Sequence, residues 1–324
     1  MGKEVKRILI KIGSNVLTLA SGLPDVKRIE NIVDQVAELR ANGTQVVLVS
    51  SGAVAAGRSK LGKTDSLDTI SRRQVLASIG QVELMKIYSN HFTRKDILCS
   101  QVLVTKEDFR TRQHYLNMKN CLDALLRSNI TPIINENDVI SITELMFTDN
   151  DELSGLVAAM MDVDALVILT NVDGIFTGHP DDKDSKLISE YNAKETNLDD
   201  YIVNTKSNFG RGGMTAKANT AVKISKLGID VYIGNGMKDG IVGNLLTQKT
   251  GTHFPPGTKD TSDLKKWVAQ SGSFFKKGDV ISIQDEKGVS IALGMVKYDS
   301  EKAKEYIGMK GSPVLVHYNY LFLS

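Results

Sequence analysis

The chain has 324 residues, a formal net charge of +2, 24% charged residues and 41% hydrophobic residues. This composition is typical of a globular protein with a sizeable core, and the small net charge does not indicate nucleic acid or a membrane as the main partner. The two cysteines, Cys99 and Cys121, exclude a disulfide framework, and no apolar run reaches the roughly 18 residues that span a bilayer. We therefore expect a cytoplasmic protein.

Short apolar runs alternate with longer amphipathic stretches along the first 235 residues. The predicted strands, in chain order, are 7–12, 45–50, 97–104, 131–135, 165–170 and 230–233. The predicted helices are 25–42, 69–92, 115–128, 152–161 and 215–227. This alternation predicts an α/β fold with a mainly parallel sheet that helices cover on both faces, although it does not fix the strand order. Ligands of such sheets bind at the carboxyl ends of the strands.

The character of the chain changes near residue 247. Residues 247–259 contain glycines and prolines among polar residues, and this composition predicts a linker. Three short alternating strands are predicted beyond it, at 278–284, 289–296 and 314–318. We therefore expect two domains, 1–255 and a small, mostly β domain at 256–324.

Small residues follow the first two predicted strands. Lys11 lies at the end of the first strand and leads into Gly13-Ser14, and the segment Ser50–Gly57 follows the second strand. Small residues there allow backbone N–H groups to close on an anion at a helix N-terminus. The alternative is that Lys11 is merely solvated and that the small residues only permit close packing.

Acidic and amide side chains form two further clusters. Asn135-Glu136-Asn137-Asp138 follows the fourth predicted strand, and Asp149-Asn150-Asp151-Glu152 begins the next helix. Turn formation and helix capping would explain each cluster without any function. Together, however, they place several carboxylates and amides at one edge of the sheet.

Two later segments also lie at strand or helix ends. Thr170–Thr177 follows the fifth predicted strand and contains Asp-Gly, which is typical of a turn. Gly210–Lys217 brings three glycines to the start of a helix with Lys217 in its first turn, although its spacing is not that of a Walker A loop. The helix dipole disfavours a lysine there, so a negative group such as a phosphate is expected nearby.

General bases are scarce around these segments. The five histidines are scattered at His91, His114, His179, His253 and His317. Phosphoryl transfer to a carboxylate needs no base, because a carboxylate with a pKa of about 4.3 is already ionised at neutral pH. Such a transfer requires that two anions are positioned and their repulsion cancelled, which lysines and backbone amides can do.

Taken in order, these segments resemble the amino acid kinase family, and within it the γ-glutamyl kinases. The resemblance covers about residues 5–255. It rests on Lys11–Ser14, Ser51–Gly57, Gly80-Gln81, Asn135–Asp138, Asp149–Asp151 and Gly212–Lys217. It implies a three-layer α/β/α sandwich and ATP-dependent phosphorylation of the γ-carboxylate of L-glutamate, the first step of proline biosynthesis.

The resemblance also implies roles for individual residues. Lys11 and Lys217 would contact the transferred phosphoryl group, and Asp151 would hold both lysines. Ser51, Asp138 and Asn150 would bind glutamate, with Asp138 on the ammonium group. The nucleotide would be held by Lys11, Thr170, Asn171, Arg211, Gly212, Gly213, Met214, Thr215, Ala216 and Lys217. Mg²⁺ would be carried by the ATP phosphates, with no ligand directly from the protein.

Members of the family imply partners as well. Proline is expected as a feedback inhibitor, the chain is expected to form a homodimer or homotetramer, and glutamyl-phosphate reductase is a candidate partner. The tail, at Lys265–Trp267 and Phe275–Tyr298, resembles a shortened PUA domain.

Two other hypotheses stay open. The chain could be a kinase of the same fold that acts on another carboxylate or on a carbamate. It could instead be an RNA-binding or regulatory protein with a vestigial kinase domain. Residues 258–324 contain ten Lys, no Arg and eight Asp or Glu, and the lack of arginine disfavours RNA binding.

Overall fold

The computed structural model divides the chain into two compact units, Met1–Val268 and Ala269–Ser324. The residues it describes are 5–61, 67–109, 112–141, 149–178, 182, 184–191, 213–257, 280–284, 290–298, 302 and 315–323. The sequence-based boundary after residue 255 stays a prediction.

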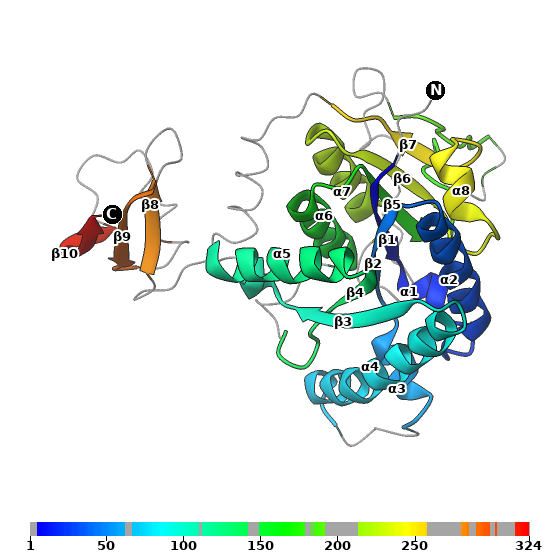
Figure 1. Cartoon of the computed structure of the whole chain (residues 1–324), viewed down its shortest axis with the longest axis horizontal. Coiled ribbons are helices and arrows are strands. Elements are labelled where there is room, and N and C mark those ends of the chain that lie inside the picture. Colours follow the sequence, from blue (N-terminus) through cyan, green and yellow to red (C-terminus); the bar gives the residue numbers. More distant parts are fainter. Residues whose placement is uncertain are drawn as a thin grey trace. The chain divides into compact units, whose positions relative to one another are not determined.

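The first unit contains a seven-stranded sheet (Figure 1). Its strands are β1 Arg7–Ile12, β2 Gln45–Ser50, β3 Leu98–Val104, β4 Ile130–Glu136, β5 Ala165–Thr170, β6 Asp230–Asn235 and β7 Thr252–Phe254. They lie in the order β3-β4-β2-β1-β5-β6-β7, and every neighbouring pair is parallel except β6 and β7. The predicted mainly parallel α/β sheet is therefore confirmed, and β1, β2 and β5 have the predicted bounds.

Helices cover both faces of this sheet (Figure 1). They are α1 Ser14–Leu17, α2 Val26–Ala41, α3 Ala53–Arg58, α4 Thr69–Thr93, α5 Arg112–Arg127, α6 Asn150–Met161, α7 Met214–Lys226 and α8 Ile241–Leu246, with a 3₁₀ helix at Lys106–Phe109. The five predicted helices correspond to α2, α4, α5, α6 and α7. The short helices α1, α3 and α8 were not predicted, because six residues or fewer are too short for a periodic pattern.

The alternation of side chains along β1 separates two hydrophobic cores. Ile8 and Ile10 pack with residues of α2, α4 and α8 on one face, whereas Leu9 packs with residues of α5, α6 and α7 on the other. All three side chains are fully buried. Two cores around one sheet confirm the three-layer α/β/α sandwich. Because side chains alternate along a strand, Lys11 shares the face of Leu9 and so faces α6 and α7.

The structure differs from the sequence-based linker at β7. Thr252–Phe254 are buried, and β7 pairs with β6 as an antiparallel edge strand of the main sheet. The polar groups that suggested a loop have partners inside the fold: Thr252 Oγ1 accepts a hydrogen bond from the Ile175 N–H at 2.8 Å, and His253 Nε2 lies 2.9 Å from Asp230. The backbone N–H of Gly257 still bonds to Ser225 of α7 at 2.7 Å.

The second unit contains a three-stranded antiparallel sheet in the order β10-β9-β8. Its strands are β8 Val280–Gln284, β9 Ser290–Val296 and β10 Val316–Leu323. The strands predicted at 278–284 and 289–296 correspond to β8 and β9, whereas the one predicted at 314–318 overlaps only the start of β10. Lys265–Trp267 lies outside the described residues. Across the described parts of the chain, no helix has the length and apolar character needed to cross a membrane.

Candidate active site

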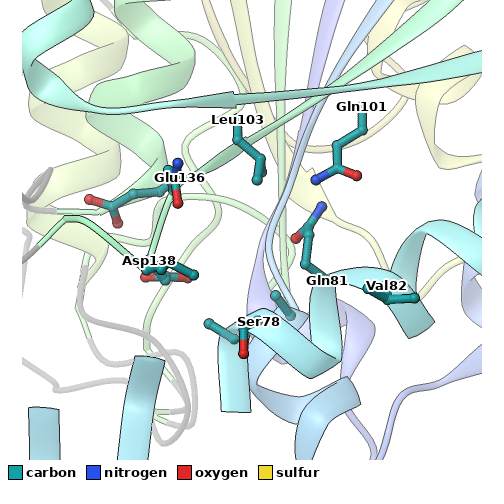
Figure 2. A pocket seen from close by; sticks show the side chains of 11 residues that line it. Ser78, Gln81, Val82, Gln101, Leu103, Glu136 and Asp138 are labelled. Carbon is teal, nitrogen blue, oxygen red and sulfur yellow. The ribbon is translucent and has the colours of Figure 1, made fainter. Parts of the chain in front are cut away.

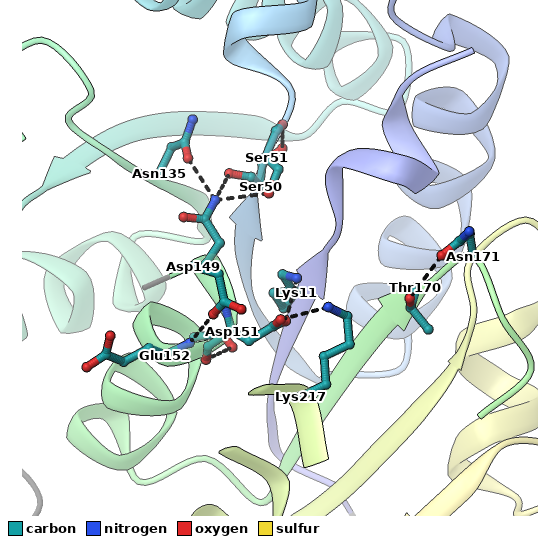
Figure 3. Close-up of polar contacts among 12 residues, drawn as sticks. Lys11, Ser50, Ser51, Asn135, Asp149, Asp151, Glu152, Thr170, Asn171 and Lys217 are labelled. Carbon is teal, nitrogen blue, oxygen red and sulfur yellow. Dashed lines mark hydrogen bonds and ion pairs between the residues drawn. The ribbon is translucent and has the colours of Figure 1, made fainter. Parts of the chain in front are cut away.

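Three charged side chains meet at the carboxyl edge of β1. Lys11 comes from β1, Asp151 from the first turn of α6 and Lys217 from the first turn of α7 (Figure 3). One carboxylate oxygen of Asp151 forms an ion pair with Lys11, and the other lies 2.9 Å from the Lys217 ammonium. We call these three residues the lysine–aspartate cluster. The negative group expected near Lys217 is thus Asp151 in this structure.

The lysine–aspartate cluster is almost inaccessible to solvent. Asp151 is 0% exposed, Lys11 3% and Lys217 8%. Burial alone would raise the pKa of Asp151, but the charges of Lys11 and Lys217 outweigh it and lower that pKa to about 2. Burial lowers the pKa of Lys11, and the Asp151 charge only partly offsets this effect. The cluster thus holds two ammonium groups around a single carboxylate.

Asp149 places Asp151 by capping α6. Its Oδ1 accepts hydrogen bonds from the backbone N–H groups of Asp151 at 2.9 Å and Glu152 at 3.1 Å. Burial, and next the negative charge of Asp151, raise the pKa of Asp149 to about 6. The protonation state of this buried carboxyl group therefore changes within the range where proteins are ordinarily assayed.

Amide side chains connect the start of α6 to β2 and β4. Asn150 donates hydrogen bonds, each of 3.0 Å, to the Ser50 carbonyl, to Ser51 Oγ and to Asn135 Oδ1. Asn135 in turn donates to Gln81 Oε1 at 3.0 Å. We call Gln81, Asn135 and Asn150 the amide network. It brings together Ser51 and Asn150, two of the three side chains expected to bind substrate.

The turn that carries Ser51 depends on close packing between α3 and α4. Gly52 adopts a φ of +102°, which favours glycine, and begins α3. A Cβ on Gly80 of α4 would lie 1.7 Å from the Ala53 carbonyl oxygen, and one on Gly57 would lie 2.0 Å from the Leu76 carbonyl oxygen. For Gly57 and Gly80 the structural interpretation of the small residues, close packing, therefore accounts for the pattern.

An open pocket of about 190 Å³ lies between α4, β3 and the segment after β4 (Figure 2). Gln81, Glu136 and Asp138 line it, and the Gln81 Nε2 donor is buried without a hydrogen-bond partner. Asp138 forms an ion pair with Arg73 of α4 at 2.5 Å. Burial raises the pKa of Asp138, and the Arg73 charge opposes that rise. Asp138, the third expected substrate residue, thus lines this pocket and pairs with Arg73, whereas Ser51 and Asn150 belong to the hydrogen-bond network at the start of α6.

Apart from Lys11 of β1, the described residues that are expected to hold the nucleotide lie around β5 and α7. Thr170 ends β5 and donates a weak 3.4 Å hydrogen bond to Asn171 Oδ1 (Figure 3). Gly213 is the N-cap residue of α7, and Met214, Thr215 and Ala216 form its first turn with Lys217. Arg211 and Gly212 lie outside the described residues.

The sequence analysis did not identify Arg73 as a site residue. It also did not assign Asp149 a role different from that of the neighbouring acidic residues. Arg72-Arg73 within a helix is typical of a solvated face, so no local signal distinguished Arg73. Asp149 did carry a signal, because an acidic residue directly before an apolar helix predicts a cap.

The comparisons with known proteins identify the family. A model of the amino acid kinase family matches residues 6–235. The chain is 42% identical over 360 residues to a glutamate 5-kinase of Bacteroides thetaiotaomicron, with all of both chains covered. It is 41% identical to a glutamate 5-kinase of Chlorobaculum tepidum, covering 98% of this chain and 97% of that one. It is 34% identical to glutamate 5-kinase 2 of Bacillus subtilis, covering 93% and 91%.

Solved structures show the same fold at lower identity. A carbamate kinase of Giardia lamblia superposes with a TM-score of 0.57 and 18% identity, covering 78% of this chain and 99% of that one. A UMP kinase of Bacillus anthracis gives a TM-score of 0.54 and 18% identity, covering 78% and 97%.

Proposed function

The chain belongs to the amino acid kinase family, and we propose that it is a glutamate 5-kinase, which phosphorylates the γ-carboxylate of L-glutamate with ATP. This reaction is the first step of proline biosynthesis. The observation that carries the proposal is the lysine–aspartate cluster, two buried lysines held by one carboxylate at the carboxyl edge of the sheet. The identity of the substrate, glutamate, is inferred from full-length relatives of about 40% identity that are glutamate 5-kinases.

In the proposed reaction a γ-carboxylate oxygen of glutamate attacks the γ-phosphorus of ATP. The bond from that phosphorus to the β–γ bridging oxygen breaks, and ADP leaves with the electron pair, so that no proton needs to be removed. Lys11 and Lys217 lie against the phosphoryl group and stabilise its negative charge during transfer. Asp151 keeps both ammonium groups in place, so little reorganisation is needed at the moment of reaction. We call this cluster the phosphoryl end of the site.

The acceptor is bound by residues of α4, β2, β4 and α6 in our proposal. Asp138 binds the ammonium group of glutamate, and Ser51 and Asn150 also belong to the glutamate site. Because Asn150 directly precedes Asp151, the amide network links these residues to the phosphoryl end. We call the pocket of Gln81, Glu136 and Asp138, together with Arg73, the acceptor end.

The nucleotide would lie over Thr170, Asn171 and the start of α7. Across the described residues, no group of three or more His, Cys, Asp or Glu side chains is placed to hold a metal ion. Asp151 is engaged by two lysines, and Asp149 by two backbone N–H groups. We therefore propose that Mg²⁺ is carried by the ATP phosphates, where it supplies further positive charge.

Regulation and assembly are proposed from the same family membership. Proline, the end product of the pathway, is expected to inhibit, and a homodimer or homotetramer is expected in solution. Glutamyl-phosphate reductase is the proposed partner that consumes the acyl phosphate product. Because such a mixed anhydride hydrolyses readily in water, the product must be used soon after it is released.

Trapping the product tests the proposal directly. The full chain is incubated with ATP, Mg²⁺ and hydroxylamine, which converts an acyl phosphate into a hydroxamate that forms a coloured complex with ferric iron. Glutamate, aspartate, N-acetylglutamate and carbamate are supplied in parallel, with samples lacking ATP as controls. Hydroxamate from glutamate alone is expected. ATP consumption with another acceptor would favour a different kinase of this fold, and no consumption with any acceptor would contradict kinase activity.

A further inference from the structure

Arg73 lies beside Asp138 at the acceptor end, with donors to spare. Its Nη2 and Nε lie 2.5 and 3.2 Å from the same oxygen, Asp138 Oδ1. These bonds use two of the five N–H donors of the guanidinium group. The side chain of Arg73 is 31% exposed, whereas that of Asp138 is 10% exposed. Arg73 is therefore partly accessible to solvent while it remains anchored to a carboxylate that lines the pocket.

Arg73 lies on the same face of α4 as two residues that line the pocket. Arg73, Ala77 and Gln81 are spaced by four residues, so they share one face of the helix. Ala77 and Gln81 line the pocket, and Gln81 Nε2 is a buried donor without a partner. The same helix face thus offers two sets of donors, those of Arg73 and the Gln81 amide, and both suit the oxygens of a carboxylate.

The charges of this pair complement those of an amino acid. A free amino acid carries an ammonium group and a carboxylate on the same carbon atom, and Asp138 with Arg73 presents the opposite charges in contact. We infer that Arg73 binds the α-carboxylate of the amino-acid substrate while Asp138 binds its ammonium group. This inference rests on the proposed function, since it concerns the orientation of glutamate in that site. It would make Arg73 a residue that selects substrates with a free α-carboxylate.

The alternative role for Arg73 is purely to position Asp138. The two roles make different predictions for L-glutamate and for its α-amide, isoglutamine. Both compounds carry the ammonium group and the γ-carboxylate, but only glutamate carries the α-carboxylate. If Arg73 binds that carboxylate, Arg73→Gln affects glutamate alone; if it only positions Asp138, both compounds are affected equally.

The experiment measures kcat/KM for both compounds by ADP release. This quantity is the initial slope of rate against substrate concentration, so weak binding does not prevent its measurement. The unaltered chain is expected to prefer glutamate over isoglutamine by about 10- to 100-fold, the worth of a charge-assisted hydrogen bond. Arg73→Gln should lower kcat/KM for glutamate by a similar factor and leave isoglutamine within about twofold. The preference is then largely lost.

Two further variants make the result interpretable. Arg72→Gln removes the neighbouring arginine, which is exposed, and should change neither compound. Arg73→Lys keeps the charge without the planar fork, so an intermediate preference is expected even if Arg73→Gln folds poorly by circular dichroism. An equal loss for glutamate and isoglutamine in the Arg73 variants would overturn the inference and leave the proposed function intact. Failure of the unaltered chain to phosphorylate glutamate would instead overturn the proposed function.

Discussion

At the phosphoryl end, Lys11, Asp151 and Lys217 are buried and paired with one another. At the acceptor end, by contrast, the Gln81 Nε2 donor is buried without a partner and Arg73 is partly exposed. A buried charge left unpaired would be costly, so the phosphoryl end carries its own counter-ion and stays assembled without ligand. The acceptor end contains hydrogen-bond donors without protein partners, and a bound substrate can accept hydrogen bonds from them. In this site the charged groups that act on the phosphoryl group are already in place before ligands bind. Specificity depends instead on donors that gain their partners only when the substrate binds.

Removing one lysine of the phosphoryl end should have the largest effect. We expect Lys11→Ala or Lys217→Ala to lower kcat by roughly 10²-fold or more and to change KM far less, because each charge matters most during transfer. Steady-state kinetics with both substrates measures this. Lys95→Ala is the matched control, since Lys95 forms an exposed ion pair with Asp34 at 2.7 Å. Near-normal kcat with weaker ATP binding in both variants would contradict the catalytic assignment.

The cost of burying the Asp149 carboxylate beside the phosphoryl end should appear in the pH dependence of stability. The pKa of Asp149 is about 6 in the folded chain, against an ordinary value of 3.8. Between these values the unfolded chain loses the proton first, so the free energy of unfolding falls as pH rises. The difference of about two pKa units corresponds to roughly 3 kcal/mol. Asp149→Asn keeps a capping oxygen and removes this titration.

Urea unfolding of both chains from pH 3.5 to 7 measures that difference. Asp149→Asn should gain stability relative to the unaltered chain as pH rises through 6, and the gain should level off above it. A stability difference that does not change with pH would show that Asp149 ionises normally.

At the acceptor end, Asp138→Asn should weaken glutamate binding selectively. Loss of the charge-assisted bond to the ammonium group is expected to raise KM for glutamate by about 10- to 100-fold and to leave KM for ATP nearly unchanged. Glutarate, which lacks the ammonium group, is the control substrate and should be used equally by both chains. An unchanged KM for glutamate would place the ammonium contact elsewhere.

Close packing beneath the acceptor end can be tested with two glycines. Gly80→Ala would bring a Cβ within 1.7 Å of the Ala53 carbonyl oxygen, so α3 and α4 must separate. A loss of about 1–3 kcal/mol of stability is expected, together with weaker glutamate binding through the Ser51 turn. Gly243→Ala in α8 meets no atom within 4 Å and should be neutral or slightly stabilising. Thermal unfolding of both variants provides the comparison; equal midpoints would contradict the packing argument.

The smallest effect is expected from removing the second unit. Every described site residue lies before Gly251. The last described contact of this part of the chain with α7 is the hydrogen bond from the Gly257 N–H to Ser225. A chain that ends after Gly257 should therefore keep kcat within a few-fold, although proline inhibition or oligomer size can change. Activity, inhibition curves and light scattering of the two chains are measured together. Complete loss of activity in a shortened chain that is still folded by circular dichroism would show that the tail completes the site.

Local sequence signals located most of the helices and strands. Apolar β-branched runs bounded by polar residues or glycine located β1, β2 and β5 without error, and apolar residues at helical spacing located α2 and α4 to within one residue at each end. These signals are local, because propensity and periodicity depend on neighbouring residues. The expectation that Lys11, Asp151 and Lys217 act together came from the resemblance to a family and not from their spacing.

Contacts between residues that are distant in the sequence depend on how the elements pack together. The three residues of the phosphoryl end come from β1, α6 and α7. They meet because β1 lies beside β5 in the sheet, and because α6 and α7 pack on the same face of that sheet. The strand β7 is three residues long, so it carries no periodic signal and is defined by its pairing with β6. Arg73 looks like any solvated arginine until α4 packs next to the turn that carries Asp138. Long-range pairing brings such groups together, and local sequence does not encode it.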